Sequence, residues 1–324
     1  MDNFRTELIL AKAAPIHHAM PVVTAGSCFA DHIGSRLKDT KFPCLANPFG
    51  VAYSPVAIHN NLLAALRGTA PAAQGYLQQE EGWKHFQFHS RWWAATQQEL
   101  QTALTKTLTE TASFLASADV VLLTYGTAWV YKHRATEQLV ANCHKMPAKE
   151  FDKLLLSPAQ IIESFGVWHQ ALRSVRPHVR IILTVSPVRH IKDTLELNQV
   201  SKAALRLACH YITQQFSNTE YFPAYELLMD DLRDYRFYDR DLIHPSGTAI
   251  DYIWQKFSER YFDRYTQQRI EKINAIRQAL AHRPFQPHAA AHQKFLRELL
   301  KQLEELKAEV NMEEEITSVQ SQII

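Results

Sequence analysis

The sequence predicts an α/β protein in which helices cover a parallel sheet. Short apolar or β-branched runs recur along the 324 residues, and each run is followed by a polar turn and then by a helical pattern. With 46% hydrophobic residues, the chain can bury a full core and is long enough for one large domain and an appendage. We therefore expect one domain over residues 1–264 and a C-terminal helical extension over residues 265–324.

The expected strands are runs of consecutive apolar residues, which indicate burial on both faces of a sheet. The clearest runs are residues 21–25, 118–125 and 180–185, and two weaker ones are residues 42–46 and 220–224. Between the strands, apolar residues spaced at three and four predict helices packed on the sheet. These helices are expected at residues 32–37, 160–175, 202–215 and 249–261.

Three segments fit this repeat poorly, namely residues 65–115, 128–150 and 186–200. In doubly wound folds the ligand lies outside the carboxyl ends of the strands, so insertions that follow strands are suited to form pocket walls. We expect these segments to surround the functional site.

The C-terminal extension is expected to contain two helices. The first carries Ile270, Ile273 and Ile276, and two prolines within residues 282–288 should end it. The second has apolar residues at alternating spacings of three and four, which are Leu296, Leu299, Leu303, Leu306 and Val310. Such a face is typical either of a helix packed on its own domain or of a short coiled coil, which would allow self-association through residues 291–310. Residues 312–324 are expected to fray.

Composition argues against several classes of partner. The formal charge is +2, with both signs spread along the chain, so no strong field attracts nucleic acid or anionic lipid. No apolar run approaches the ~20 residues of a membrane span, and the first residues lack the pattern of a signal peptide. The four cysteines show no metal-site or disulfide spacing. We expect a cytoplasmic protein with reduced thiols, no metal and no cofactor.

Ser27 lies between the first expected strand and the helix that follows it, in the run Gly-Ser-Cys-Phe-Ala at residues 26–30. There its hydroxyl would project at the carboxyl end of the strand, beside helix-start amides that can stabilise an oxyanion. This geometry favours acyl transfer. The structural alternative is that Ser27 only caps the helix, because serine is a preferred N-cap residue and glycine commonly forms the preceding turn.

Asp241 and His244 are the expected partners of Ser27. They stand three residues apart, just before another helical pattern. This spacing lets the carboxylate orient the imidazole and stabilise the imidazolium that forms when it takes the serine proton. The alternative is that Asp241 caps a turn and Pro245 starts the next helix.

Cys28 is a rival nucleophile, because a helix N-terminus can lower the pKa of a thiol. Its side chain is expected to point away from that of Ser27 and into the core. We therefore favour Ser27 as the nucleophile over Cys28.

The sequence resembles the GSCFA family, which is regarded as a branch of the SGNH, or GDSL-type, hydrolases. The resemblance covers roughly residues 4–262 and rests on several segments in one order, which are GSCFA at 26–30, NPFGVAYSP at 47–55, LTYGTAWVY at 123–131, NCHK at 142–145, SPVRH at 186–190 and YFPAYELLMDDLRDYRFYDRDLIHP at 221–245. It implies a doubly wound, flavodoxin-like parallel sheet. It also implies that Ser27, Asp241 and His244 form the catalytic set.

The resemblance further implies where an oxyanion would bind. SGNH enzymes take donors from the serine amide, from a glycine of a second motif and from an asparagine in a Gly-x-Asn motif. Ser27 and Gly50 match the first two, but the third position holds Ala128, which has no side-chain donor. Replacement donors would come from the polar residues nearby in the matching segments, which are Thr127, Asn47, Asn142 and His144.

The expected function is therefore that of a serine hydrolase acting on an O-acyl or O-acetyl ester of a small molecule or glycan. Asn142, His144, Arg189 and His190 are the candidates for substrate binding. An acyltransferase would use the same site with an alcohol in place of water. The alternative of a different class is a catalytically weak SGNH-like binding or scaffold protein that assembles through its C-terminal helix, which the missing asparagine favours.

Overall fold

The computed structural model describes residues 6–282, 284–286 and 288–324. Its central feature is a five-stranded sheet in the order β10-β9-β5-β1-β2, in which every pairing is parallel. The strands are β1 (Val22–Gly26), β2 (Cys44–Ala46), β5 (Val120–Tyr125), β9 (Arg180–Val185) and β10 (Thr219–Tyr221). Taken in chain order, the second strand lies outside the first and the others follow on the opposite side, as in flavodoxin-like folds. The predicted fold class is confirmed.

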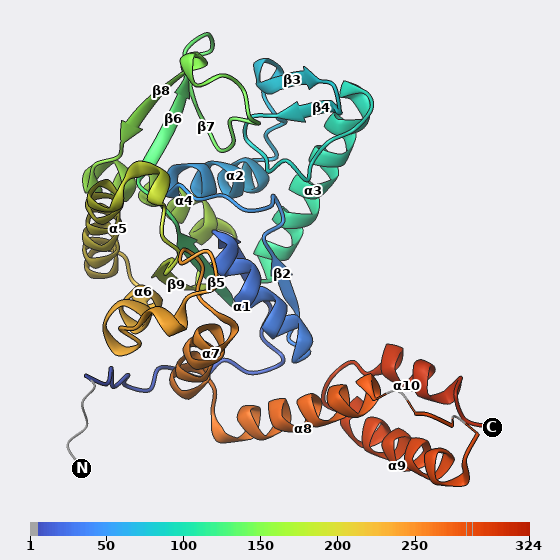
Figure 1. Cartoon of the computed structure of the whole chain (residues 1–324). Coiled ribbons are helices and arrows are strands. Elements are labelled where there is room, and N and C mark those ends of the chain that lie inside the picture. Colours follow the sequence, from blue (N-terminus) through green and yellow to red (C-terminus); the bar gives the residue numbers. More distant parts are fainter. Residues whose placement is uncertain (1–5, 283, 287) are drawn as a thin grey trace. The chain divides into compact units, whose positions relative to one another are not determined.

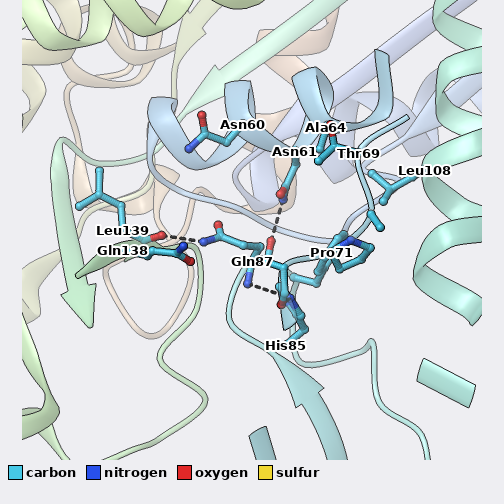
Figure 2. Close-up of a pocket in the computed structure, with 13 residues that line it drawn as sticks. Asn60, Asn61, Ala64, Thr69, Pro71, His85, Gln87, Leu108, Gln138 and Leu139 are labelled. Atoms are coloured by element: carbon cyan, nitrogen blue, oxygen red, sulfur yellow. Dashed lines mark hydrogen bonds between the residues drawn. The ribbon is translucent and has the colours of Figure 1, made fainter. Parts of the chain in front are cut away.

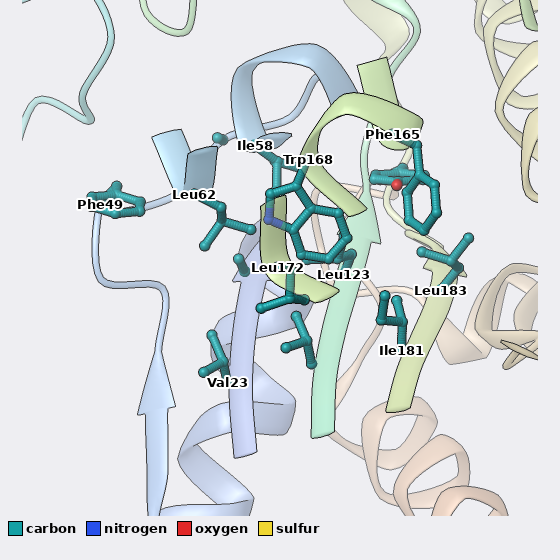
Figure 3. Close-up of a cluster of buried hydrophobic side chains, with 14 of the residues drawn as sticks. Val23, Phe49, Ile58, Leu62, Leu123, Phe165, Trp168, Leu172, Ile181 and Leu183 are labelled. Carbon is teal, nitrogen blue, oxygen red and sulfur yellow. The ribbon is translucent and has the colours of Figure 1, made fainter. Parts of the chain in front are cut away.

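Helices cover this sheet, and four of them lie where the spacing of apolar residues predicts, at residues 28–39, 158–175, 195–215 and 247–261. They are α1 (Cys28–Asp39), α2 (Pro55–Arg67), α3 (Gln97–Ser117), α4 (Pro158–Val175), α5 (Leu195–Gln215), α6 (Ala224–Glu226) and α7 (Gly247–Tyr261). Helices α2 and α4 contact each other as they cross the sheet (Figure 1). Figure 3 shows Leu62 of α2 and Trp168 of α4 packed against strand residues such as Leu123, all of them fully buried.

Two small antiparallel sheets are formed by residues in, or directly after, the segments that fit the repeat poorly. One is the hairpin of β3 (Tyr76–Gln79) and β4 (Gly82–His85), and the other has the order β7-β6-β8. Its strands are β6 (Trp129–His133), β7 (Gln138–Val140) and β8 (Phe151–Leu155).

Helix α3 also lies in these segments, where no helix was predicted. The sequence does contain a helix-start signal and an apolar repeat for α3. Thr96 and Glu99 form a capping box, and Leu100, Leu104 and Leu108 repeat at four-residue spacing on its buried face. The many threonines between these leucines obscure the pattern, because threonine has low helix propensity.

The chain divides into two compact units. The first includes Pro21–Ser35 and Cys44–Lys256, and the second consists of Ala11–Met20, Arg36–Pro43 and Phe257–Ile324. The last boundary between the units lies between Lys256 and Phe257, and the domain boundary expected at 264–265 stays a prediction. Within the described residues, no helix combines the length and the apolar character that crossing a membrane requires.

The second unit contains α8 (Arg264–Ala281), α9 (Ala290–Lys307) and α10 (Glu313–Gln320). The expectation that residues 312–324 fray is wrong. Met312, Ile316 and Val319 are buried against α9, since their spacing puts the three side chains on one face. The leucine face of α9 packs on residues of α8 and α10 of the same chain, so its apolar seam is already covered. Of the predicted helix break, residues 283 and 287 lie outside the described residues.

Candidate active site

The candidate site begins where β1 meets α1, at the switch point between β1 and β5. The turn depends on Gly26, whose φ is +139°. The Gly26 amide donates to Asn47 Oδ1 at 2.7 Å, and its carbonyl accepts from the Ala52 amide at 2.9 Å. These bonds tie the segment after β2 to the end of β1. Ligands bind at such switch points in open parallel sheets.

Ser27 caps α1. Its side chain accepts a hydrogen bond from the Phe29 amide at 3.3 Å, and its own amide donates to Thr124 O at 3.0 Å. The residue is fully buried, with a relative exposure of 0%. The capping arrangement that was the structural alternative for Ser27 is therefore present.

Cys28 is the first residue of α1 and is partly exposed. Burial and, next, the Asp31 carboxylate raise the pKa of its thiol above the ordinary value. The backbone amides of Cys28 and Phe29, which lie close to the sulfur, oppose this shift, as does the ammonium of Lys202. The thiol therefore lies at the helix start and within electrostatic reach of a buried cation.

Lys202 of α5 supplies that cation and is only 2% exposed. Its Nζ donates to Gly126 O at 2.8 Å and to Ser186 O at 2.7 Å, which joins the segments that follow β5 and β9. Desolvation lowers the pKa of Lys202 to about 7. Lys202 was predicted only as part of a helix. A signal was available, because Lys202 shares a helix face with Leu205, Cys209 and Ile212, all of which are buried.

The shifted pKa of Lys202 predicts a pH dependence of stability. Between about 7 and the ordinary value of 10.5, the unfolded chain binds more protons than the folded one, so folding is favoured as the pH rises. Urea denaturation should show that wild type gains stability relative to Lys202→Met between about pH 6 and about pH 9. Lys106→Met, at a side chain with 76% exposure, is the control and should show no such change. A pH-independent difference between wild type and Lys202→Met would contradict the assignment.

Asp241 and His244 form the expected pair. His244 Nδ1 donates to Asp241 Oδ2 at 2.6 Å, and the amides of Ile243 and His244 donate to Asp241 Oδ1 at 2.9 and 3.0 Å. These bonds, first that of the His244 amide and then that of its side chain, lower the pKa of Asp241 to about 2. Because an ionised carboxylate only accepts, the imidazole carries its proton on Nδ1, and Nε2 is left with the basic lone pair. The two side chains are 46% and 48% exposed.

His190 interacts electrostatically with His244 and contacts the ring of Tyr53. The Arg189 amide donates to Ile243 O at 3.2 Å, which holds the segment after β9 beside the Asp-His loop. The ring of His190 lies 5.2 Å from that of Tyr53, edge to face. Burial lowers the pKa of His190 to about 4, and Lys202 and His244 also act in this direction. Tyr53 in turn interacts electrostatically with Cys28, so these residues form one neighbourhood.

Arg189 points to aromatic rings instead of to an open site. Its guanidinium carbon lies 4.1 Å from the ring centroid of Tyr238 and 5.4 Å from that of Tyr235. Cation–π contacts of this kind hold a side chain in place. The predicted roles of Arg189 and His190 in substrate binding stay predictions.

Four of the six residues predicted as oxyanion donors have partners within the chain for the groups that would donate. The amide of Gly50 donates to Asn47 O at 2.8 Å, and that of Ser27 donates to Thr124 O. The Thr127 hydroxyl bonds Ser201 Oγ at 2.9 Å, and Asn47 Nδ2 donates to Asp31 Oδ1 at 2.7 Å. Each of these four would have to exchange a bond before it could hold an oxyanion. Their present bonds hold the loops around the turn.

Asn142 and His144 line a separate cavity of about 690 Å³, together with residues of the β3–β4 hairpin. His144 Nε2 is bonded to His85 O at 2.9 Å, and Asn142 Oδ1 accepts from the His144 amide at 2.8 Å. Arg91, also in the lining, donates to the carbonyls of Asn47 and Pro48. Through Arg91 the cavity borders the loop that contains Asn47 and Pro48, and neither Ser27 nor Cys28 lines the cavity.

Figure 2 shows another cavity, of about 370 Å³, bordered by α2 and the segment after β4. Its walls are held by hydrogen bonds from Asn61 Nδ2 to Gln87 O and from Gln87 Nε2 to Leu139 O. His85 is the titratable residue in its lining, and both ring nitrogens have backbone partners, Ala72 O and the Gln87 amide. The described residues that line this cavity therefore include no acid–base pair. Within the part of the chain that the structure describes, no group of three or more His, Cys, Asp or Glu side chains is arranged to hold a metal ion.

A family model described as the GSCFA family matches residues 21–257. The chain belongs to the GSCFA family. The resemblance noted in the sequence is confirmed, and the family is SGNH-like. A second model, described as the C-terminal domain of GSCFA domain proteins, matches residues 273–324.

No curated protein matches the GSCFA chain significantly. Among solved structures, it is similar to an acetyl xylan esterase from the rumen bacterium Butyrivibrio proteoclasticus, with 10% identity and a TM-score of 0.29. The match covers 76% of this chain and 66% of the esterase, slightly less than two thirds of that protein's length.

Proposed function

We propose that this GSCFA protein hydrolyses carboxylic esters, with His244 as the general base and Asp241 as the group that orients it. The observation that carries the proposal is the 2.6 Å bond from His244 Nδ1 to an ionised Asp241, which leaves Nε2 as the proton acceptor. The pair belongs to the same compact unit as the β1–α1 turn. Membership of an SGNH-like family adds support.

In the proposed reaction, a side chain at the start of α1 attacks the ester carbonyl while His244 takes its proton. The imidazolium, stabilised by Asp241, then protonates the departing alcohol. A water molecule, deprotonated by His244, attacks the acyl-enzyme and releases the carboxylic acid. The pair is about half exposed, so a substrate can reach it from solvent. The proposed substrate is an O-acyl or O-acetyl ester of a small molecule or a glycan. A cytoplasmic location is part of the proposal, because the four cysteines are free, as in reducing compartments.

The test is the hydrolysis of short p-nitrophenyl esters by the full chain. His244→Ala should lower kcat/KM by roughly 10²–10⁴-fold, the contribution of a positioned general base. Asp241→Asn should also lower it, because the amide can hold the imidazole in the wrong tautomer. His210→Ala is the matched control, since His210 is an exposed residue on α5. Unchanged kcat/KM in a folded His244→Ala protein would refute the role of His244.

A further inference from the structure

Ser27 and Cys28, the two adjacent candidates for the nucleophile, differ in their exposure to solvent. Ser27 has a relative exposure of 0%, and its side-chain oxygen is bonded to the Phe29 amide as a helix cap. A substrate carbonyl would have to displace packed atoms to reach it. Cys28, the next residue, is partly exposed. A nucleophile must come within about 3–3.5 Å of the carbonyl carbon, so access favours the thiol.

We propose that Cys28, and not Ser27, supplies the nucleophile of this site. The inference rests on the proposed ester hydrolysis and assigns Ser27 a positioning role as the cap of α1. The expectation from the sequence was the reverse, because it placed the Cys28 side chain in the core.

The surroundings of Cys28 suit a thiol that becomes negative during the reaction. Its sulfur lies beside the amides of Cys28 and Phe29, at the positive end of α1. The buried ammonium of Lys202 uses two of its three hydrogens on Gly126 O and Ser186 O, and it interacts electrostatically with Cys28. Both features stabilise a thiolate more than a thiol.

The same surroundings explain why a base is needed. Burial and the Asp31 carboxylate keep the pKa of Cys28 above its ordinary value, in spite of Lys202 and the helix amides. The resting group is therefore a thiol at neutral pH. Tyr53 interacts with Cys28 and contacts His190, and His190 interacts with His244, so the base lies in the same neighbourhood.

The chemistry balances without a further reactant. Cys28 Sγ forms a bond to the carbonyl carbon as its proton passes to His244 Nε2. The C–O bond of the ester then breaks, and the alcohol leaves with that proton. Water attacks the resulting thioester, the C–S bond breaks, and the products are a carboxylic acid and the free thiol.

The experiment compares Cys28→Ala, Ser27→Ala and Cys143→Ser with wild type, using p-nitrophenyl acetate and mass spectrometry of the acid-quenched protein. Cys143 is the matched control because it is also free and partly exposed. Cys28→Ala should lose at least about 10³-fold in kcat/KM, and wild type should carry an acetyl group on the peptide that contains Cys28. Iodoacetamide should inactivate wild type and Cys143→Ser at equal rates. Folding of each variant is checked by circular dichroism.

The outcomes separate the two proposals. An acetyl group on Ser27, together with full activity in folded Cys28→Ala, would overturn the inference and leave the proposed hydrolysis intact. Absence of ester hydrolysis by wild type would overturn the proposed function and the inference with it. Ser27→Ala should keep activity within about tenfold of wild type after allowance for the stability lost with the cap, which is typically ~1 kcal/mol.

Discussion

Gly26→Ala should prevent this protein from folding stably, with a loss of at least about 4 kcal/mol in the free energy of unfolding. An added Cβ would lie 2.1 Å from Thr124 O, a backbone atom of the neighbouring strand. A φ of +139° is strained for any residue with a side chain. The contact cannot be relieved by rotating a side chain, so β1 would have to separate from β5. Urea denaturation followed by circular dichroism measures the loss.

Gly247→Ala is the matched control for Gly26→Ala. A Cβ at Gly247 meets no atom within 4 Å, and the residue begins α7. The substitution should leave stability unchanged or raise it by up to about 1 kcal/mol, because alanine restricts the unfolded chain. Equal stabilities for the two variants would show that the β1–α1 turn tolerates a side chain.

Trp168→Ala should cost about 3–5 kcal/mol of unfolding free energy, the usual range for removal of a large buried aromatic side chain. Trp168 is 0% exposed in the core that α4 forms with α2 and the sheet (Figure 3). Its ring stacks on that of His59 at 5.8 Å and meets Phe165 edge to face at 5.4 Å. A 2.7 Å hydrogen bond between His59 Nε2 and Tyr125 OH ties α2 to β5 and limits collapse into the space. The urea midpoint measures the cost.

Trp168→Phe separates the packing of the ring from its polar group. The indole Nε1 is buried and has no hydrogen-bond partner among the described residues, so phenylalanine removes an unsatisfied donor along with part of the ring volume. The phenylalanine variant should therefore recover most of the stability lost in Trp168→Ala. A cost for Trp168→Phe as large as that for alanine would mean that packing in this core depends on the complete indole.

The sequence alone determined the elements with strong local patterns. Continuous apolar runs identified the strands of the central sheet, and the spacing of apolar residues identified α1, α4, α5 and α7, because burial on a sheet imposes these periods locally. The strands of the two small antiparallel sheets were not predicted. The pair of Asp241 and His244 could be recognised for the same reason, since its members are only three residues apart and their contact needs no distant partner. Helix α10 was not predicted, because it is short and its apolar residues become buried only by packing against α9.

Only the tertiary structure decided which groups at the β1–α1 turn are exposed and which are hydrogen-bonded within the chain. Ser27 and Cys28 are neighbours in one motif, and no local pattern tells which of them is covered by the strands and loops around the turn. The same holds for Lys202, which reaches from α5 to the ends of β5 and β9 and interacts electrostatically with Cys28. The amides of Ser27 and Gly50 likewise donate hydrogen bonds to backbone carbonyls. Exposure and hydrogen bonding depend on contacts between segments far apart in the chain, which residue periodicity does not encode.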